Sequence, residues 1–138
     1  LVYQFYNLVP VLDVVENMCL PVLMDGRKVN ERRLTALLSR LGLTGREHHL
    51  PNQLSGGQQQ RVAIGRALMN APAVVLADEP TGNLDSKNSA EIMALLRKSS
   101  RELKQTLVVI THDEEIALSA DRVISLEDGR IASDTRAR

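Results

Sequence analysis

Polar residues that could carry phosphate chemistry follow two short apolar runs of this sequence. The run AVVLA ends in Asp78 and Glu79, and the run TLVVI ends in a Thr-His-Asp segment that contains His112. A further carboxylate, Asp85, lies in the segment TGNLDS. In open α/β sheets, ligands bind beyond the carboxyl ends of the strands, where carboxylates and a histidine can serve phosphate hydrolysis as metal ligand, base and sensor. Each signal alone is weak, because a carboxylate after a strand often only caps the next turn.

A second candidate site is the segment LSGGQQQRVAIGRAL, in which two glycines begin a helical pattern. Ser55 and Gln58 form a capping-box pattern, which needs no ligand. Gly56 and Gly57 nevertheless cost helix propensity, up to about 1 kcal/mol each relative to alanine, and leave the free N–H groups of the first turn uncovered. A bare helix start beside a hydroxyl suits a phosphate, because the helix dipole and the N–H groups both favour an anion. The sequence leaves both interpretations open.

Helices dominate the part of the chain that must position this second site. Asp13 heads a capping-box pattern and begins one helix, and a second helix runs from the cap Asn30 to Gly42 with leucines on one narrow face. The glycine pair begins a third helix, from Ser55 to Asn70.

Strands alternate with helices in the rest of the chain. The β-branched, nearly all-apolar runs are typical of strands that are buried on both faces. Helical segments lie between them, which predicts a parallel sheet with right-handed crossovers. The end LEDGRIAS predicts a tight hairpin at Asp128 and Gly129 that closes this sheet. The three predicted strands are residues 73–77, 106–110 and 122–126.

Composition narrows the classes of protein to consider. The 138 residues are 43% hydrophobic and 25% charged, which is typical of one globular domain, or most of one, and argues against disorder. Seventeen basic and seventeen acidic side chains cancel, so no overall field favours nucleic acid or an anionic membrane. The single cysteine, Cys19, excludes an internal disulfide framework and fits a reducing compartment.

The order of the motifs resembles that of the ATP-binding cassette (ABC) ATPases. LSGGQQQR is followed by VVLADEPTGNLD and then by VVITHD, and the resemblance extends from Gln4 to the end of the chain. It implies an α/β fold with a P-loop NTPase-like parallel sheet, the carboxyl half of the catalytic core, at about residues 71–138. An ABC helical subdomain would occupy about residues 5–70. EPTGNLD and NLVP are similar to the lipoprotein-releasing and macrolide-export branch.

The resemblance implies a role for each strand-end candidate. Gln4 would be the Q-loop glutamine, which senses the metal and the attacking water. Asp78 would hold Mg²⁺, chiefly through water, and Glu79 would be the general base. His112 would be the switch histidine that contacts the γ-phosphate, and Asp85 would be the D-loop residue that communicates across a dimer.

The glycine pair would belong to the signature motif of the family, Leu54 to Gln58. The resemblance implies that Ser55, Gly56, Gly57 and Gln58 bind an ATP held by a partner subunit, with Ser55 and Gly57 touching the γ-phosphate. The implied partner is a second ABC ATPase subunit, in a homodimer that sandwiches two nucleotides.

A transmembrane permease subunit is the other implied partner, at the cytoplasmic face of a bacterial inner membrane, with no nucleic acid. The aromatic residues Tyr3, Phe5 and Tyr6 would lie where the family forms a groove for a coupling helix of the permease. Ordinary core packing of these three side chains is the alternative. The resemblance therefore implies an ATPase that powers export or lipoprotein release.

One family motif is missing, since none of the eight glycines is followed by Lys and then Ser or Thr, as a P-loop requires. The chain begins with Leu1, and LVYQ is typical of the end of a strand, so we expect it to begin within a domain and to hydrolyse little ATP by itself. Two alternatives stay open: a non-transport ABC ATPase that acts on nucleic acid, and a non-catalytic regulatory fragment. The compact segment between Gln4 and Leu54 and the neutral charge argue against the first.

Overall fold

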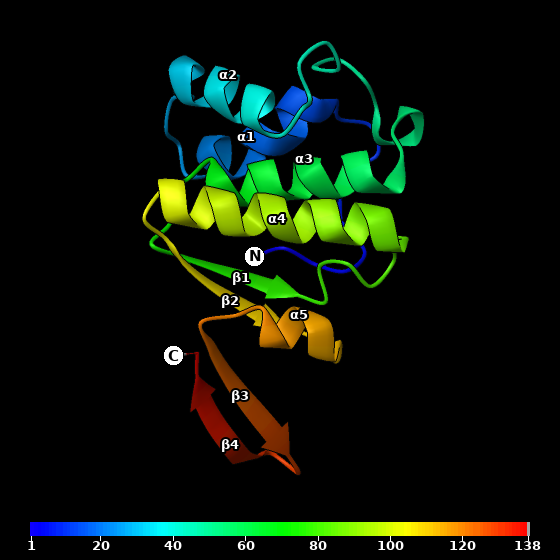
Figure 1. The fold of residues 1–138 in the computed structure, drawn as a ribbon. Helices are drawn as coiled ribbons and strands as arrows, with labels where there is room; N and C mark the ends of the chain where they lie inside the picture. The colour runs from blue at the N-terminus through cyan, green and yellow to red at the C-terminus, as the bar shows by residue number, and fades with distance from the viewer. Residues whose placement is uncertain (138) are drawn as a thin grey trace.

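A computed structural model describes residues 1–137 and shows a layered α/β arrangement (Figure 1). Helices form the upper layers, a two-stranded parallel sheet lies beneath them, and an antiparallel hairpin lies at the lower end. In chain order the elements are α1 (Val14–Met24), α2 (Glu31–Arg40), the 3-10 helix η1 (Pro51–Gln53), α3 (Gly56–Leu68), β1 (Val74–Asp78), α4 (Ser86–Glu102), β2 (Thr106–Ile110), α5 (Glu114–Leu118), β3 (Arg122–Glu127) and β4 (Arg130–Arg136).

The helices begin and end where their local signals predict. Asp13 Oδ1 accepts a hydrogen bond from Glu16 N at 2.8 Å, and Glu16 Oε2 accepts one from Asp13 N at 3.2 Å, which makes a capping box for α1. Asn30 Oδ1 caps α2 by accepting from Arg33 N at 3.0 Å. Gly42 follows α2 with a φ of +66°, the left-handed conformation that ends many helices.

The main core lies between the helices and one face of the sheet. Helices α1 and α3 pack closely, because a Cβ on Gly65 would come within 2.7 Å of Met18 Cε and 2.8 Å of Leu41 Cδ1. Helix α4 and strand β1 add further apolar side chains from the opposite side of α3. The fully buried apolar side chains include Val2, Val14, Met18, Leu41, Leu43, Val62, Ile64, Leu68 and Ile92.

The parallel sheet matches the prediction for its first two strands. β1 and β2 pair in parallel with Val74 opposite Thr106 and Asp78 opposite Ile110, and α4 forms the crossover between them. Val2 makes a single parallel bridge to Ala77 on the other edge of β1. The segment that begins the chain therefore runs beside β1, as the LVYQ pattern indicated.

Two predictions about the sheet are wrong within the described residues. β3 does not join the parallel sheet but pairs only with β4, through a turn at Asp128 and Gly129 in which both residues have positive φ. The short turn makes this pairing nearly free of loop-closure cost, so it forms locally and leaves the other sheet separate.

The strands are also not buried on both faces, which corrects the second prediction. Alternate residues of β1 and β2 face the helices or the surface, and Leu76 and Ile110 are 48% and 62% exposed. A nearly all-apolar run in the sequence predicts only that both faces of the strand are hydrophobic. Whether a second layer packs on the outer face depends on other segments, and no described element covers it.

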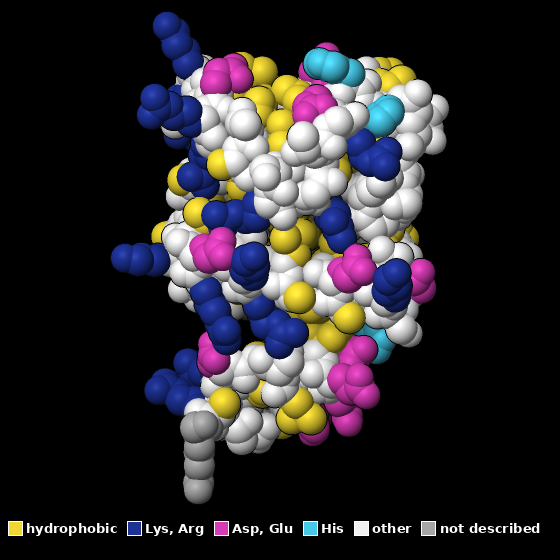
Figure 2. All heavy atoms as spheres, turned by 45° about the horizontal axis from the view of Figure 1, so that its top comes forward, with side chains coloured by type: hydrophobic (Ala, Val, Ile, Leu, Met, Phe, Trp, Pro, Cys, Tyr) yellow, Lys and Arg dark blue, Asp and Glu magenta, His cyan; other side chains and the backbone are white. Residues whose placement is uncertain are grey.

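The surface carries side chains of both charge signs. Basic and acidic side chains both occur on the face in Figure 2, and neither covers it completely. No helix within residues 1–137 has the length and apolar composition to cross a bilayer.

Candidate functional site

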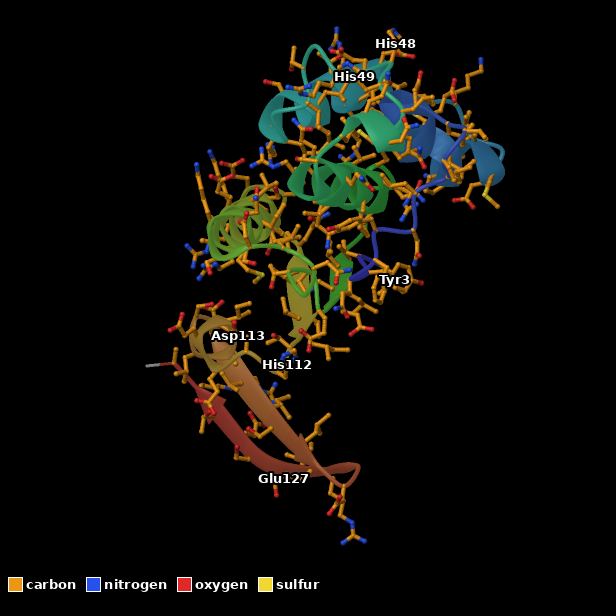
Figure 3. The ribbon with its side chains drawn as sticks, turned by 90° about the vertical axis from the view of Figure 1, so that its right-hand side faces the viewer. Tyr3, His48, His49, His112, Asp113 and Glu127 are labelled. Atoms are coloured by element: carbon orange, nitrogen blue, oxygen red, sulfur yellow. The ribbon has the colours of Figure 1, made fainter. Side chains whose placement is uncertain are left out.

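Glu79 and His112 form a side-chain pair just beyond the carboxyl end of the parallel sheet. His112 Nδ1 lies 2.7 Å from Glu79 Oε1, and the backbone N–H of His112 donates to the same oxygen at 3.0 Å. Thr111 Oγ1 donates to Glu79 Oε2 at 3.4 Å. Figure 3 shows His112 below the end of β2, on the side of the sheet that faces the hairpin.

The register of the sheet creates this pair. Asp78 lies opposite Ile110, so the residues that follow the two strands emerge side by side. The backbone N–H of Glu79 donates to Ile110 O at 2.9 Å, and Glu79 has a φ of +45°. A non-glycine residue in this left-handed region is strained, and such strain concentrates at functional sites.

The pair favours a protonated imidazole. The hydrogen bond that the ring donates to Glu79, and then the negative charge of Glu79, raise the pKa of His112 above its ordinary value of 6.5. Asp113 adds a smaller effect in the same direction. The imidazole is 89% exposed, whereas the Glu79 side chain is only 22% exposed, so solvent and ligands reach the site from the histidine side.

Removing the carboxylate should lower the pKa of His112. Because folding raises this pKa, the pair stabilises the folded protein below the ordinary value of about 6.5, and this contribution is lost as the pH rises through the raised pKa. We expect NMR titration of the His112 ring to give a lower midpoint in Glu79→Gln than in the wild type. Asp113→Asn, the control, should lower the midpoint less. Equal midpoints in wild type and Glu79→Gln would show that the pair does not form in solution.

Asp78, the predicted metal ligand, ends β1 with an exposed side chain. Asp85 is engaged elsewhere: its Oδ1 accepts from Asn88 N at 2.8 Å and caps α4. No three His, Cys, Asp or Glu side chains within residues 1–137 gather in a way that could hold a metal ion. The predicted set of carboxylates and histidine thus does not form a complete metal site from side chains alone.

Gln4 lies against the loop that follows Glu79. Its Nε2 donates to Asn83 Oδ1 at 3.4 Å, and Asn83 Nδ2 donates back to Gln4 O at 3.2 Å. A Cβ on Gly82 would lie 2.5 Å from Gln4 Nε2, so any larger residue at position 82 would displace the Gln4 side chain. The fold therefore places Gln4 beside the loop that connects β1 to α4.

The predicted capping box at the start of α3 is present. Ser55 Oγ accepts from Gln58 N at 3.2 Å, and Gln58 Oε1 accepts from Ser55 N at 3.0 Å. A Cβ on Gly56 would lie 3.0 Å from Tyr6 Oη, and one on the buried Gly57 would lie 2.6 Å from Asn88 Oδ1. The two glycines therefore also have a packing reason, since the first turn of α3 lies against Tyr6 and against the first turn of α4.

Gly57→Ala should be destabilising through Asn88. The new methyl group would overpack the Asn88 amide, which the Asp85 carboxylate holds in place, and overpacking typically costs about 1–3 kcal/mol. We expect urea unfolding to show that Gly57→Ala costs about 1 kcal/mol less in an Asn88→Ala background, a normal coupling for side chains in contact. In a Lys87→Ala background, the matched control, its cost should be unchanged. The same cost in all three backgrounds would contradict the contact.

The aromatic residues near Gln4 have different surroundings. Phe5 is 70% exposed, and Tyr3 is 38% exposed and points outward in Figure 3. Tyr6 is half-buried against Gly56, and the Arg66 guanidinium donates to Tyr6 O at 2.8 Å. Core packing, the alternative for all three, is therefore wrong for Phe5.

Several residues of the site were not predicted from the sequence. The sequence carries no signal for the partners that they contact. These residues are Gln60, Asn83 and Asn88.

Comparisons with known proteins find sequence relatives for nearly the whole chain. The family described as ABC transporter matches residues 1–82. The macrolide export ATP-binding/permease protein MacB of Rhodopirellula baltica is 51% identical over 141 residues, covering 99% of this chain and 21% of that protein. MacB of Sodalis glossinidius is 51% identical over 137 residues, with 98% and 21% covered. The chain thus spans about a fifth of the length of these relatives.

Solved structures show the same fold. A dimeric ATP-binding cassette in a post-hydrolysis state, bound to ADP and Pi, aligns with a TM-score of 0.83 at 43% identity and covers 99% of this chain and 62% of that one. A part of the cbiONQ ABC transporter complex of Clostridium perfringens aligns with a TM-score of 0.87 at 31% identity, with 98% and 55% covered.

Proposed function

Because the chain belongs to the ABC transporter family and has the P-loop NTPase-like fold of its cassettes, we propose that it acts in ATP hydrolysis that powers transport across a bacterial inner membrane. The observation that carries this proposal is the Glu79–His112 pair at the carboxyl end of a parallel sheet. Identity of about half the residues to macrolide export proteins favours the export branch.

Glu79 is the proposed general base for the attacking water. The contacts from His112 and Thr111 fix the orientation of its carboxylate, so that its free lone pairs can accept a proton from water. The imidazole of His112, protonated over a wider pH range by this pairing, can donate to a γ-phosphate oxygen. The general base, Glu79, and the residue that contacts the phosphate, His112, are thus joined by a hydrogen bond.

Asp78 and Gln4 are the proposed metal residues, with Mg²⁺ as the ion. Mg²⁺ prefers oxygen ligands and is commonly held by one or two carboxylates together with substrate phosphates and water. An exposed carboxylate at the end of β1 fits that kind of site. The ion would neutralise charge on the phosphates, while Asp78 and Gln4 orient its water ligands.

The first turn of α3 is the proposed contact to a nucleotide on a second subunit. Ser55 is exposed at the helix start, and the backbone N–H groups of Gly56 and Gly57 in the first turn favour a phosphate, while the Gln58 N–H donates to Ser55 Oγ and fixes the position of that hydroxyl. Asp85, at the start of α4, is joined to this turn through Asn88, which contacts Gly57. This link supports a role for Asp85 in communication between two sites of a dimer.

A permease is the proposed membrane partner. Tyr3 and Phe5 flank Gln4 in the chain, and both side chains are exposed, so they are the proposed contact surface. A permease helix on this surface would be coupled to the nucleotide site through Gln4. The proposed location is therefore the cytoplasmic face of the membrane.

Mg²⁺-dependent ATPase activity tests the proposed function. We expect the full-length protein that carries this chain to hydrolyse ATP when Mg²⁺ is present, and a lack of such hydrolysis would overturn the proposal. The 138 residues contain no Gly-Lys-Ser/Thr phosphate cradle. We therefore expect the 138-residue chain alone to bind Mg-ATP with a Kd weaker than about 1 mM in isothermal titration, and tighter binding would show that another segment supplies the cradle.

A further inference from the structure

One buried amide in the molecule has no part in the chemistry proposed above. Gln60 lies in α3 and is fully buried, with 0% of its surface exposed. Its Nε2 donates to two backbone carbonyls, Tyr3 O at 3.0 Å and Pro80 O at 2.5 Å. The first carbonyl directly precedes Gln4, and the second directly follows Glu79.

Packing alone does not explain a glutamine at this position. The second polar atom of the side chain, Gln60 Oε1, is buried and has no hydrogen-bond partner among the described residues. A buried acceptor without a partner costs free energy, and an apolar side chain of similar volume would avoid that cost. The two hydrogen bonds that Nε2 donates therefore explain why this buried position carries a glutamine.

These bonds restrict the separation of two distant segments. Because both carbonyls bind the same nitrogen atom, Tyr3 O and Pro80 O cannot separate without breaking one of the two bonds. Asn83 and Gln4 add a second pair of bonds between the same segments, on the exposed side. The Gln4 segment and the loop after Glu79 are thus joined from the core by Gln60 and from the surface by Asn83.

We infer that Gln60 is a positioning residue: it fixes the separation of Gln4 and Glu79 so that both side chains can face one nucleotide. The inference rests on the roles proposed above for Gln4 and Glu79. Since Gln60 belongs to the same helix as Ser55, it also ties the first turn of α3 to both residues. Displacement of α3 would move the metal-sensing amide and the base together.

Kinetics of Gln60→Met in the full-length protein test this inference. Methionine keeps an unbranched side chain of similar volume but donates no hydrogen bond. We expect kcat for ATP hydrolysis to fall about 10- to 100-fold, the effect of a small misplacement of reacting groups, with KM for ATP nearly unchanged. The variant should remain folded, with a lower thermal unfolding midpoint because two carbonyls lose their donor. Gln59→Met is the matched control, because this neighbouring amide donates only to Leu54 O within its own helix start. It should keep the wild-type kcat.

Glu79→Gln, measured in parallel, separates this inference from the proposed function. If Glu79→Gln hydrolyses ATP normally, both fail. If Glu79→Gln is inactive but folded Gln60→Met keeps the wild-type kcat, or loses ATP affinity instead, only the positioning role fails. If Gln60→Met does not fold, Asn83→Ala is measured instead, because Asn83 joins the same two segments on the exposed side. An unchanged kcat in that variant would then overturn the inference.

Discussion

Glu79→Gln in the full-length protein is expected to lower kcat for ATP hydrolysis by about 10²- to 10⁴-fold, the usual contribution of a positioned base. Nucleotide binding should survive. The amide keeps the size of the carboxylate, and its Oε1 can still accept the bond from the His112 backbone N–H. The basicity is lost, together with the negative charge that raises the pKa of His112. Steady-state ATPase assays with a separate measurement of the Kd for Mg-ATP check both parts of the prediction.

A matched substitution controls for the loss of one negative charge near the site. Glu114 begins α5, two residues after His112, and its side chain is exposed. Glu114→Gln should therefore hydrolyse ATP at the wild-type rate. Normal turnover by Glu79→Gln would mean that Glu79 serves only the turn after β1 and that the base lies elsewhere.

Ser55→Arg in one subunit of a dimer is expected to abolish hydrolysis at the site whose nucleotide is held by the other subunit. The exposed position would carry a bulky cation over the first turn of α3, where the γ-phosphate is proposed to bind. Loss of the Ser55 cap alone would cost about 1 kcal/mol of stability, too little to remove hydrolysis. Ser55→Asn, which keeps a capping side chain, separates the two effects: it should preserve stability, and Mg-ATP binding to each monomer should survive in both variants.

Mixed dimers reveal which subunit Ser55 serves. If it acts on the nucleotide of the partner, a subunit that carries both Ser55→Arg and Glu79→Gln, paired with a wild-type subunit, damages both sites. When the two changes are divided between the subunits, both fall in one site and the other stays intact. ATPase assays of dimers purified through two different tags should therefore show more activity in the divided arrangement. More activity with both changes on one subunit would show that Ser55 serves the nucleotide of its own subunit.

Local sequence signals predicted most of the elements of this fold. The capping boxes at Asp13 and Ser55 and the turn at Gly129 each involve residues within three positions of one another, so their geometry depends little on the rest of the chain. The strands at 74–78 and 106–110 agree with their apolar runs to within one residue. The exposed outer face of this sheet and the separate β3–β4 sheet could not be predicted, because each depends on which other segments pack nearby.

The sequence by itself determined which residues are candidates, since the order of its motifs identifies Gln4, Ser55, Glu79 and His112 without any coordinates. Only the tertiary structure decided their contacts. Glu79 meets His112 through the register of β1 and β2, across 33 positions of the chain. Gln60 reaches Tyr3 across 57 positions, because α3 lies against the first segment of the chain and the loop that follows β1. Such pairings follow from the packing of whole elements against each other, and no residue type or spacing within one segment encodes them.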